Sequence, residues 1–175
     1  ILLLVFVTFS YGQTPCVNGY AGIYPCSGLG LQAQIPFTDM GATNANDAWG
    51  WTDPLDGTEY AIVGLDNGTA FIDISNPTNP IYLGQLSSAS GTNLARDIKT
   101  YNNFAFIVSE ATGHGMQVFD LTRLRSVTSG PETFTVDAYY TGFGSAHNIV
   151  INEDSGIAYL VGCKTAPNNL GSTSR

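Results

Sequence analysis

The segment YAIVGLDNGTAFIDIS (residues 60–75) consists of two short apolar runs separated by Asn67-Gly68. Its β-branched and aromatic residues favour strands, and Asn-Gly supplies the positive φ that a tight two-residue turn requires. The segment therefore predicts a β-hairpin. Comparable runs recur as AFIVS from Ala105 with GMQVFDLT from Gly115, and AYLVG from Ala158 begins a further copy.

Each of these runs is preceded by a polar pair and an apolar stretch: NDAW from residue 46, RDIK from residue 96 and HNIV from residue 147. NPTNPIYLGQL adds a fourth strand from Ile81 to Leu86. Four short antiparallel strands that recur every 40 to 50 residues or so are typical of a propeller blade. We predict an all-β chain, a β-propeller fragment of about two and a half four-stranded blades.

Composition and charge exclude several classes of partner. The chain has 175 residues, of which 43% are apolar, with 6 basic and 14 acidic residues for a formal net charge of -8. Nucleic-acid binding needs clustered Lys and Arg, so we expect no nucleic-acid partner. No segment combines a basic face with an apolar one, so we expect no membrane insertion.

The amino-terminal residues predict export. Residues 1–12 begin with an apolar run that ends in Ser10-Tyr11-Gly12, as in a partial signal peptide, and this predicts a secreted or cell-surface protein. We expect Cys16 and Cys26 to form a disulfide that staples residues 13–45, and Cys163 to lack a partner. Residues 46–175 form the incomplete propeller domain, and we expect the intact protein to contain more blades.

The innermost strand of each blade lines the central channel of a propeller, so the three polar pairs should converge at one channel mouth. The candidate binding residues are therefore Asn46, Asp47, Arg96, Asp97, His147 and Asn148. We expect His147 to hydrogen-bond across the mouth, although metal or base chemistry is an alternative. Arg96 either clamps an anionic substrate with Asp97 or, as we favour, pairs with Asp47 on the neighbouring blade.

Other chemistry-bearing residues have a structural and a functional interpretation. Trp49 and Trp51 alternate, so they share one strand face, for packing or as an aromatic contact for sugars. Gly residues flank His114, which predicts an exposed loop tip. DPLDGTE, residues 53–59, lacks the full ligand pattern of a calcium loop, so we expect a solvated hairpin. NGT from Asn67 is a turn or a glycosylation acceptor.

Long ordered strings of this chain resemble the choice-of-anchor B family of secreted bacterial proteins, which are built from LVIVD-type repeats. The resemblance rests on CVNGYAGIYPCSGLGL and NDAWGWTDPLDGTEYAIVGLDNGTAFIDISNPTNPIYLG, followed by RDIKTYNNFAFIVSEATGHGMQVFDL and GSAHNIVINEDSGIAYLVG. It implies a surface-held propeller with a C-terminal anchor or sorting signal beyond this segment. It implies no catalytic residue.

The sequence thus predicts a surface protein that binds an unidentified ligand or protein partner, with no cofactor, no metal and no assigned catalytic residue. The alternative is a hydrolase or metal-dependent enzyme whose site lies at the channel mouth and includes His147. A zinc site needs three or four ligands, and one histidine beside Asn148 does not supply them.

Overall fold

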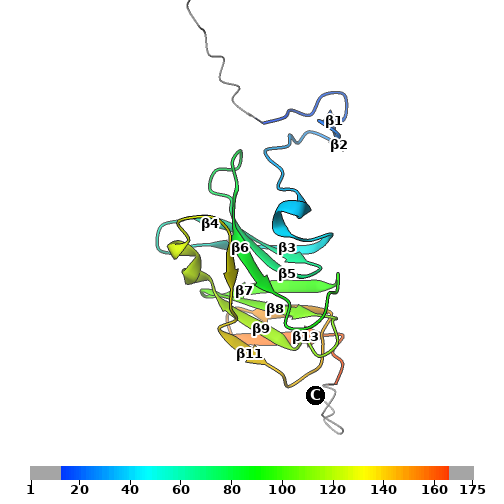
Figure 1. Cartoon of the computed structure of the whole chain (residues 1–175), viewed down its shortest axis with the longest axis vertical. Helices are drawn as coiled ribbons and strands as arrows, with labels where there is room; N and C mark the ends of the chain where they lie inside the picture. Colours follow the sequence, from blue (N-terminus) through cyan, green and yellow to red (C-terminus); the bar gives the residue numbers. More distant parts are fainter. Residues whose placement is uncertain (1–12, 166–175) are drawn as a thin grey trace, which may run out of the picture.

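The computed structural model describes residues 13–165 and consists of β-sheets stacked face to face (Figure 1). The first blade is a meander of four antiparallel strands, joined by turns at the predicted Gly-containing segments and by the proline-containing segment 74–80. Its strands are β3 (Ala45–Thr52), β4 (Glu59–Leu65), β5 (Gly68–Asp73) and β6 (Ile81–Ser87).

The second blade repeats this arrangement, and two strands of a third follow. The second consists of β7 (Arg96–Tyr101), β8 (Phe104–Ser109), β9 (Met116–Asp120) and β11 (Ala138–Tyr140). The third contains β12 (Asn148–Asn152) and β13 (Ile157–Val161), paired antiparallel. The predicted all-β propeller fragment, with two full blades and part of a third, is confirmed.

The second strands of the first two blades are offset by one residue from the sequence alignment. Tyr60 pairs with Asp73, and Phe104 pairs with Asp120, so Tyr60 is equivalent to Phe104 and not to Ala105. Asp73 and Asp120 occupy equivalent positions in the two blades. Because successive side chains of a strand point to opposite faces, this offset decides which residues enter each interface.

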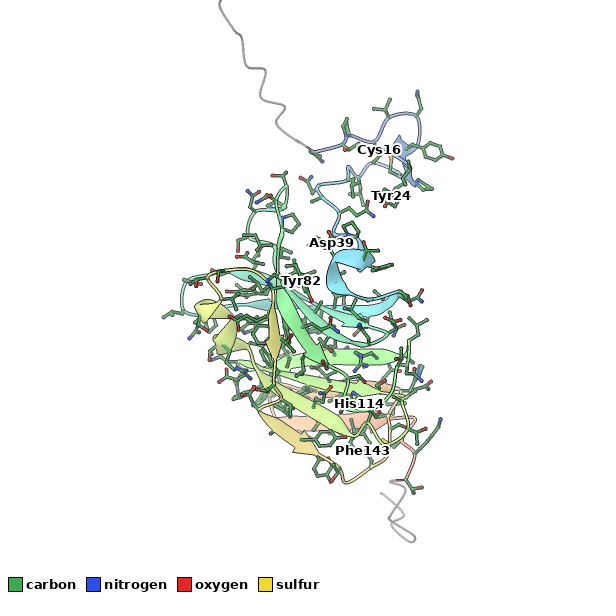
Figure 2. All side chains as sticks on the ribbon, viewed as in Figure 1. Cys16, Tyr24, Asp39, Tyr82, His114 and Phe143 are labelled. Carbon is green, nitrogen blue, oxygen red and sulfur yellow. A yellow bond between two sulfur atoms is a disulfide. The ribbon has the colours of Figure 1, made fainter. Side chains whose placement is uncertain are left out.

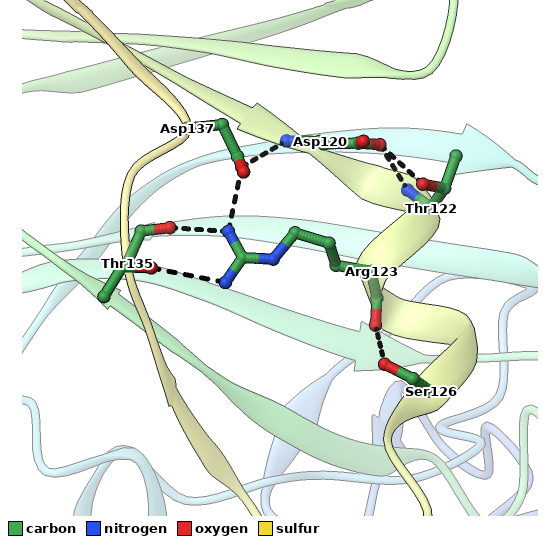
Figure 3. Close-up of polar contacts among 6 residues, drawn as sticks. All are labelled: Asp120, Thr122, Arg123, Ser126, Thr135 and Asp137. Carbon is green, nitrogen blue, oxygen red and sulfur yellow. Dashed lines mark hydrogen bonds and ion pairs between the residues drawn. The ribbon is translucent and has the colours of Figure 1, made fainter.

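A parallel strand that the sequence did not predict joins the first blade. After the 3-10 helix η2 (Leu121–Ser126), β10 (Glu132–Phe134) pairs in parallel with the outer strand β6 before the chain returns to the second blade as β11. Arg123 of η2 binds the segment that connects β10 to β11 (Figure 3). Its Nη1 donates to the Thr135 carbonyl at 2.7 Å and to Asp137 at 2.9 Å.

An apolar core lies between the first two sheets. The rings of Phe71 and Phe119 stack with centroids 4.4 Å apart, and Phe134 of β10 meets both edge-on. Ile62 and Ile98 are fully buried beside them. Aromatic pairs of this geometry add to the stabilisation from burial alone, so β10 fastens the outer edges of both blades.

The other sheet faces differ in how they are covered. The outer face of the first blade is covered by the segment around η1 (Phe37–Met40), through Met40 and Ala42. The second and third sheets bury Val108, Phe143, Ala146 and Ile149 between them. The opposite face of the third sheet is about half exposed at four apolar side chains: Val150, Ile157, Tyr159 and Val161.

The amino-terminal hairpin of β1 (Tyr20–Ala21) and β2 (Tyr24–Pro25) stands clear of the sheets (Figures 1 and 2). The predicted Cys16–Cys26 disulfide closes it. Cys163 is exposed, and no disulfide joins it to another residue in the described range 13–165. The predicted signal segment, residues 1–12, lies outside that range. No helix among the residues described is long and apolar enough to cross a membrane.

Candidate functional site

The polar pairs from three sheets line one pocket of about 250 Å³. Strand β3 contacts β7, and β7 contacts β12, so residues about 50 positions apart in sequence become neighbours. The lining residues are Asn46, Asp47, Ala95, Arg96, Asp97, His147 and Asn148, and we call this hollow the channel-mouth pocket. All six candidate residues thus meet in one place.

The acidic member of each of the first two pairs reaches the next blade. Asp47 Oδ2 accepts the backbone N–H of Ile98 at 3.0 Å, and Asp97 Oδ2 accepts that of Ile149 at 2.6 Å. Asn46 Nδ2 donates to the Arg96 carbonyl at 2.9 Å. These contacts satisfy backbone groups of the innermost strands and fix the spacing of the blades.

The two carboxylates of the pocket differ in electrostatic environment. Burial, together with a hydrogen bond to Asp97, raises the pKa of Asp47. Burial acts to raise the pKa of Asp97 too, but hydrogen bonds from Lys99 and Ile149 outweigh it and lower that pKa. Lys99 Nζ lies 2.8 Å from Asp97 Oδ1. Of the two carboxylates, Asp97 is therefore more firmly ionised than Asp47.

His147 lies at the rim of the channel-mouth pocket with more than half of its side chain exposed. Its Nδ1 is 2.8 Å from Glu110 Oε1, a contact between the second and third blades. The Nε2 atom makes no hydrogen bond among the residues described. Nor is any group of three or more His, Cys, Asp and Glu in residues 13–165 arranged to hold a metal ion.

The expectation for the Arg96 side chain is wrong. It is only 1% exposed and points between the first two blades, away from Asp47. Nε donates to the Leu65 carbonyl and Nη2 to Ser88 Oγ, each at 3.0 Å. A guanidinium enclosed in this way cannot clamp a substrate, although Arg96 is among the residues that line the channel-mouth pocket.

The prediction that His114, labelled in Figure 2, is an exposed loop tip is also wrong, because the residue is fully buried. Its Nε2 lies 3.0 Å from Arg96 Nη1. Gly113 and Gly115 have φ of 74° and 62°, so the chain turns tightly there and directs the imidazole inward. The flanking glycines were a sequence signal of the tight turn, but nothing in the sequence connects residue 114 with Arg96.

The two tryptophans of β3 differ in their surroundings. Trp51 is buried in the core and stacks on Tyr60 with ring centroids 5.2 Å apart. Trp49 is partly exposed: its Nε1 donates to Thr100 Oγ1 at 3.1 Å, and Lys99 Nζ lies 4.2 Å from the ring centroid. Trp51 is therefore a packing residue, and Lys99 occupies one ring face of Trp49.

The segment at residues 53–59 is not simply a solvated hairpin, because Asp53 is buried and pairs with Arg125 of η2. The two Arg125–Asp53 contacts measure 2.6 and 2.7 Å, which is the bidentate geometry of a strong ion pair. Asn67 lies in the β4–β5 turn, where its side chain donates to the Gly41 carbonyl and accepts from Gln85.

Two further hollows contain none of the candidate residues. One, of about 390 Å³, lies beside the third sheet and is lined by Tyr140, Phe143, Tyr159 and Cys163 among others. The other, of about 280 Å³, lies between η1, β6 and β10 and includes Asp39, Tyr82 and Glu132. Of these three hollows, the channel-mouth pocket is the one whose walls come from the innermost strands β3, β7 and β12.

Comparison with known families identifies the type of repeat. The LVIVD repeat model matches residues 58–87, which are strands β4, β5 and β6 of the first blade. No curated protein and no solved structure matched the chain. The fold and this match together define a β-propeller protein with an LVIVD repeat. The finer resemblance to choice-of-anchor B proteins remains an expectation.

Proposed function

We propose that this chain is part of an exported, surface-associated propeller that binds a small polar ligand, or a polar side chain of a protein partner, at the channel-mouth pocket. The observation that carries the proposal is the convergence of Asn46, Asp47, Asp97, His147 and Asn148 on one hollow. The Cys16–Cys26 disulfide supports export, because disulfides persist outside the reducing cytosol.

The chemistry of the pocket favours a ligand rich in hydrogen-bond donors. Asp47 and Asp97 supply carboxylate oxygens, and the amides of Asn46 and Asn148 add groups that can both accept and donate. The inter-blade hydrogen bonds hold the carboxylates in place before a ligand arrives, which reduces the entropy lost on binding. Sugars, amino acids and amines are the classes that fit these groups.

Nuclear magnetic resonance of the isotope-labelled chain tests this proposal with a defined panel of monosaccharides, amino acids and diamines. We expect at least one compound to shift the amide signals of residues 46–48, 96–98 and 147–149 together. Asn148→Ala should weaken that binding, whereas Asp39→Asn, in a separate hollow, should leave it unchanged. If no panel member moves these amides, or if Asn148→Ala binds as well as the native chain, the proposal fails.

A second candidate function, hydrolysis with His147 as general base, is favoured by the His147–Glu110 contact. A carboxylate on Nδ1 orients the imidazole and leaves Nε2 facing solvent, as a general base requires. Turnover of a panel of nitrophenyl esters and glycosides tests this. Activity that disappears in both His147→Ala and Glu110→Gln supports it, and activity that persists in either variant excludes it.

A further inference from the structure

The Arg96 side chain connects the first two blades from inside their interface. It starts on β7 of the second blade and donates to the Leu65 carbonyl of the first blade and to Ser88, which directly follows β6. Its Nη1 lies 3.0 Å from His114 Nε2, in the loop between β8 and β9. The guanidinium therefore bridges the first blade and a loop of the second, in a place closed to solvent.

Hydrogen bonding fixes the protonation state of His114. Arginine only donates, so His114 Nε2 must accept from Arg96 and cannot carry a proton. Nδ1 lies 3.0 Å from the Gly115 carbonyl, which only accepts, so the single ring proton is on Nδ1. The contact exists only while the imidazole is neutral.

Within residues 13–165, the His114 ring has no carboxylate partner that would stabilise a second proton. The titratable or charged groups around it are Arg96 from β7 and Tyr139 from β11, whose hydroxyl donates to the His114 carbonyl. Asp66, at the end of β4, acts on Arg96 and is itself hydrogen-bonded by Thr43. Among the described residues, no carboxylate hydrogen-bonds either Arg96 or His114. A protonated His114 would therefore face a buried guanidinium across 3.0 Å.

We propose that the Arg96–His114 contact is an acid-sensitive latch whose release on protonation of His114 separates the first two blades at the channel end. The Arg96 backbone is also part of the channel-mouth pocket, where its carbonyl accepts from Asn46. Release of the latch therefore also deforms the pocket, so acid lowers its affinity for a ligand. This last step rests on the proposed function, whereas the latch itself does not.

The direction and size of the effect follow from proton linkage. Burial lowers the pKa of His114 to about 4 from its ordinary value of 6.5. An opened or unfolded chain binds the proton more readily, so the closed state is fully favoured above pH 6.5 or so and loses stability as the pH falls toward 4. These values predict that the equilibrium constant for opening rises about 20-fold between pH 7 and pH 5.

Two measurements on the whole chain test the latch, and neither uses a ligand. The first is urea unfolding at pH 7 and pH 5, followed by tryptophan fluorescence, to which Trp51 in the blade interface contributes. It compares the native chain with His114→Gln, whose amide oxygen can still accept from Arg96 but does not titrate. The matched control is His147→Gln, which removes the other histidine. The second is a pH titration of the histidine Cε1 signals of the native chain by nuclear magnetic resonance.

Between pH 7 and pH 5, we expect the equilibrium constant for unfolding to rise by a factor about 20-fold larger in the native chain and in His147→Gln than in His114→Gln. The His114 signal should stay that of a neutral ring until the pH approaches about 4. Equal pH dependence in native chain and His114→Gln would overturn the latch, as would a His114 signal that titrates near 6.5. Should His114→Gln not fold, the titration of the native chain decides alone. An absence of ligand binding would count against the proposed function and not against the latch.

Discussion

Asp97 of the second blade accepts a hydrogen bond from the backbone N–H of Ile149 in the third, at 2.6 Å between oxygen and nitrogen. Asp47 makes the equivalent contact with Ile98, one blade earlier. The repeated polar pair is thus a structural device that joins innermost strands, and it also brings polar side chains to the channel-mouth pocket. One position serves both architecture and a candidate binding site.

The first prediction concerns this tie. Asp97→Ala leaves the buried N–H of Ile149 without its acceptor, so we expect the free energy of unfolding to fall by about 1–3 kcal/mol in urea titrations. Asp97→Asn keeps an acceptor oxygen and should lose less. Equal losses in the two variants would show that the charge, through Lys99, and not the hydrogen bond, is what stabilises the blade contact.

The second prediction concerns the aromatic core. Phe119 is fully buried between Phe71 and Phe134, so Phe119→Ala should lower the free energy of unfolding by about 3–5 kcal/mol. Leu55→Ala, at a side chain that is mostly exposed, is the control and should change it by less than about 0.5 kcal/mol. Similar losses from both variants would contradict the placement of the core.

The third prediction concerns acid stability at Asp53. The hydrogen bond from Arg125 lowers the pKa of the Asp53 carboxyl, so the pair stabilises the fold at high pH and is lost as the pH falls through that lowered pKa. Arg125→Ala removes the hydrogen bond that lowers the pKa of Asp53. We expect its acid-unfolding midpoint, followed by circular dichroism, to move to higher pH than in the native chain. Lys164→Ala is the control, and a shift of the same size there would exclude a specific effect of the ion pair.

The fourth prediction concerns β10. Gly84 of β6 has a φ of +145°, and a Cβ there would collide with the backbone of Glu132. Gly84→Ala should therefore detach β10 while the rest of the first blade persists. Amide hydrogen exchange should show faster exchange in residues 132–134 than in β4. Unchanged protection of residues 132–134 would mean that β10 does not depend on this close approach.

Local patterns in the sequence were sufficient to predict the blade strands except β11, the outer strand of the second blade. Strand formation depends on runs of β-branched and aromatic residues, and the turns depend on Asn-Gly and similar pairs, as at Asn67-Gly68. The gathering of Asp47, Asp97 and Asn148 at one pocket was also predicted, because equivalent positions of repeated blades must lie side by side. Fixed repeat geometry converts sequence spacing into spatial proximity.

Sequence patterns could not predict the long-range contacts of individual side chains. Arg96 stands beside Asp97 at a channel position, but alternation along β7 directs its side chain into the blade interface, where it meets Leu65 and His114. The pairing of Asp53 with Arg125 and the parallel strand β10 likewise join segments from different parts of the chain. No local periodicity encodes such contacts.

The sequence by itself determined the all-β propeller class, the blade strands other than β11, the disulfide and the convergence of the polar pairs, because each follows from local preference or from repetition. The tertiary structure alone decided which polar side chains face the channel-mouth pocket and which are buried. That choice depends on strand register and on the turn around His114, where a shift of one residue would place a side chain on the opposite face of its sheet.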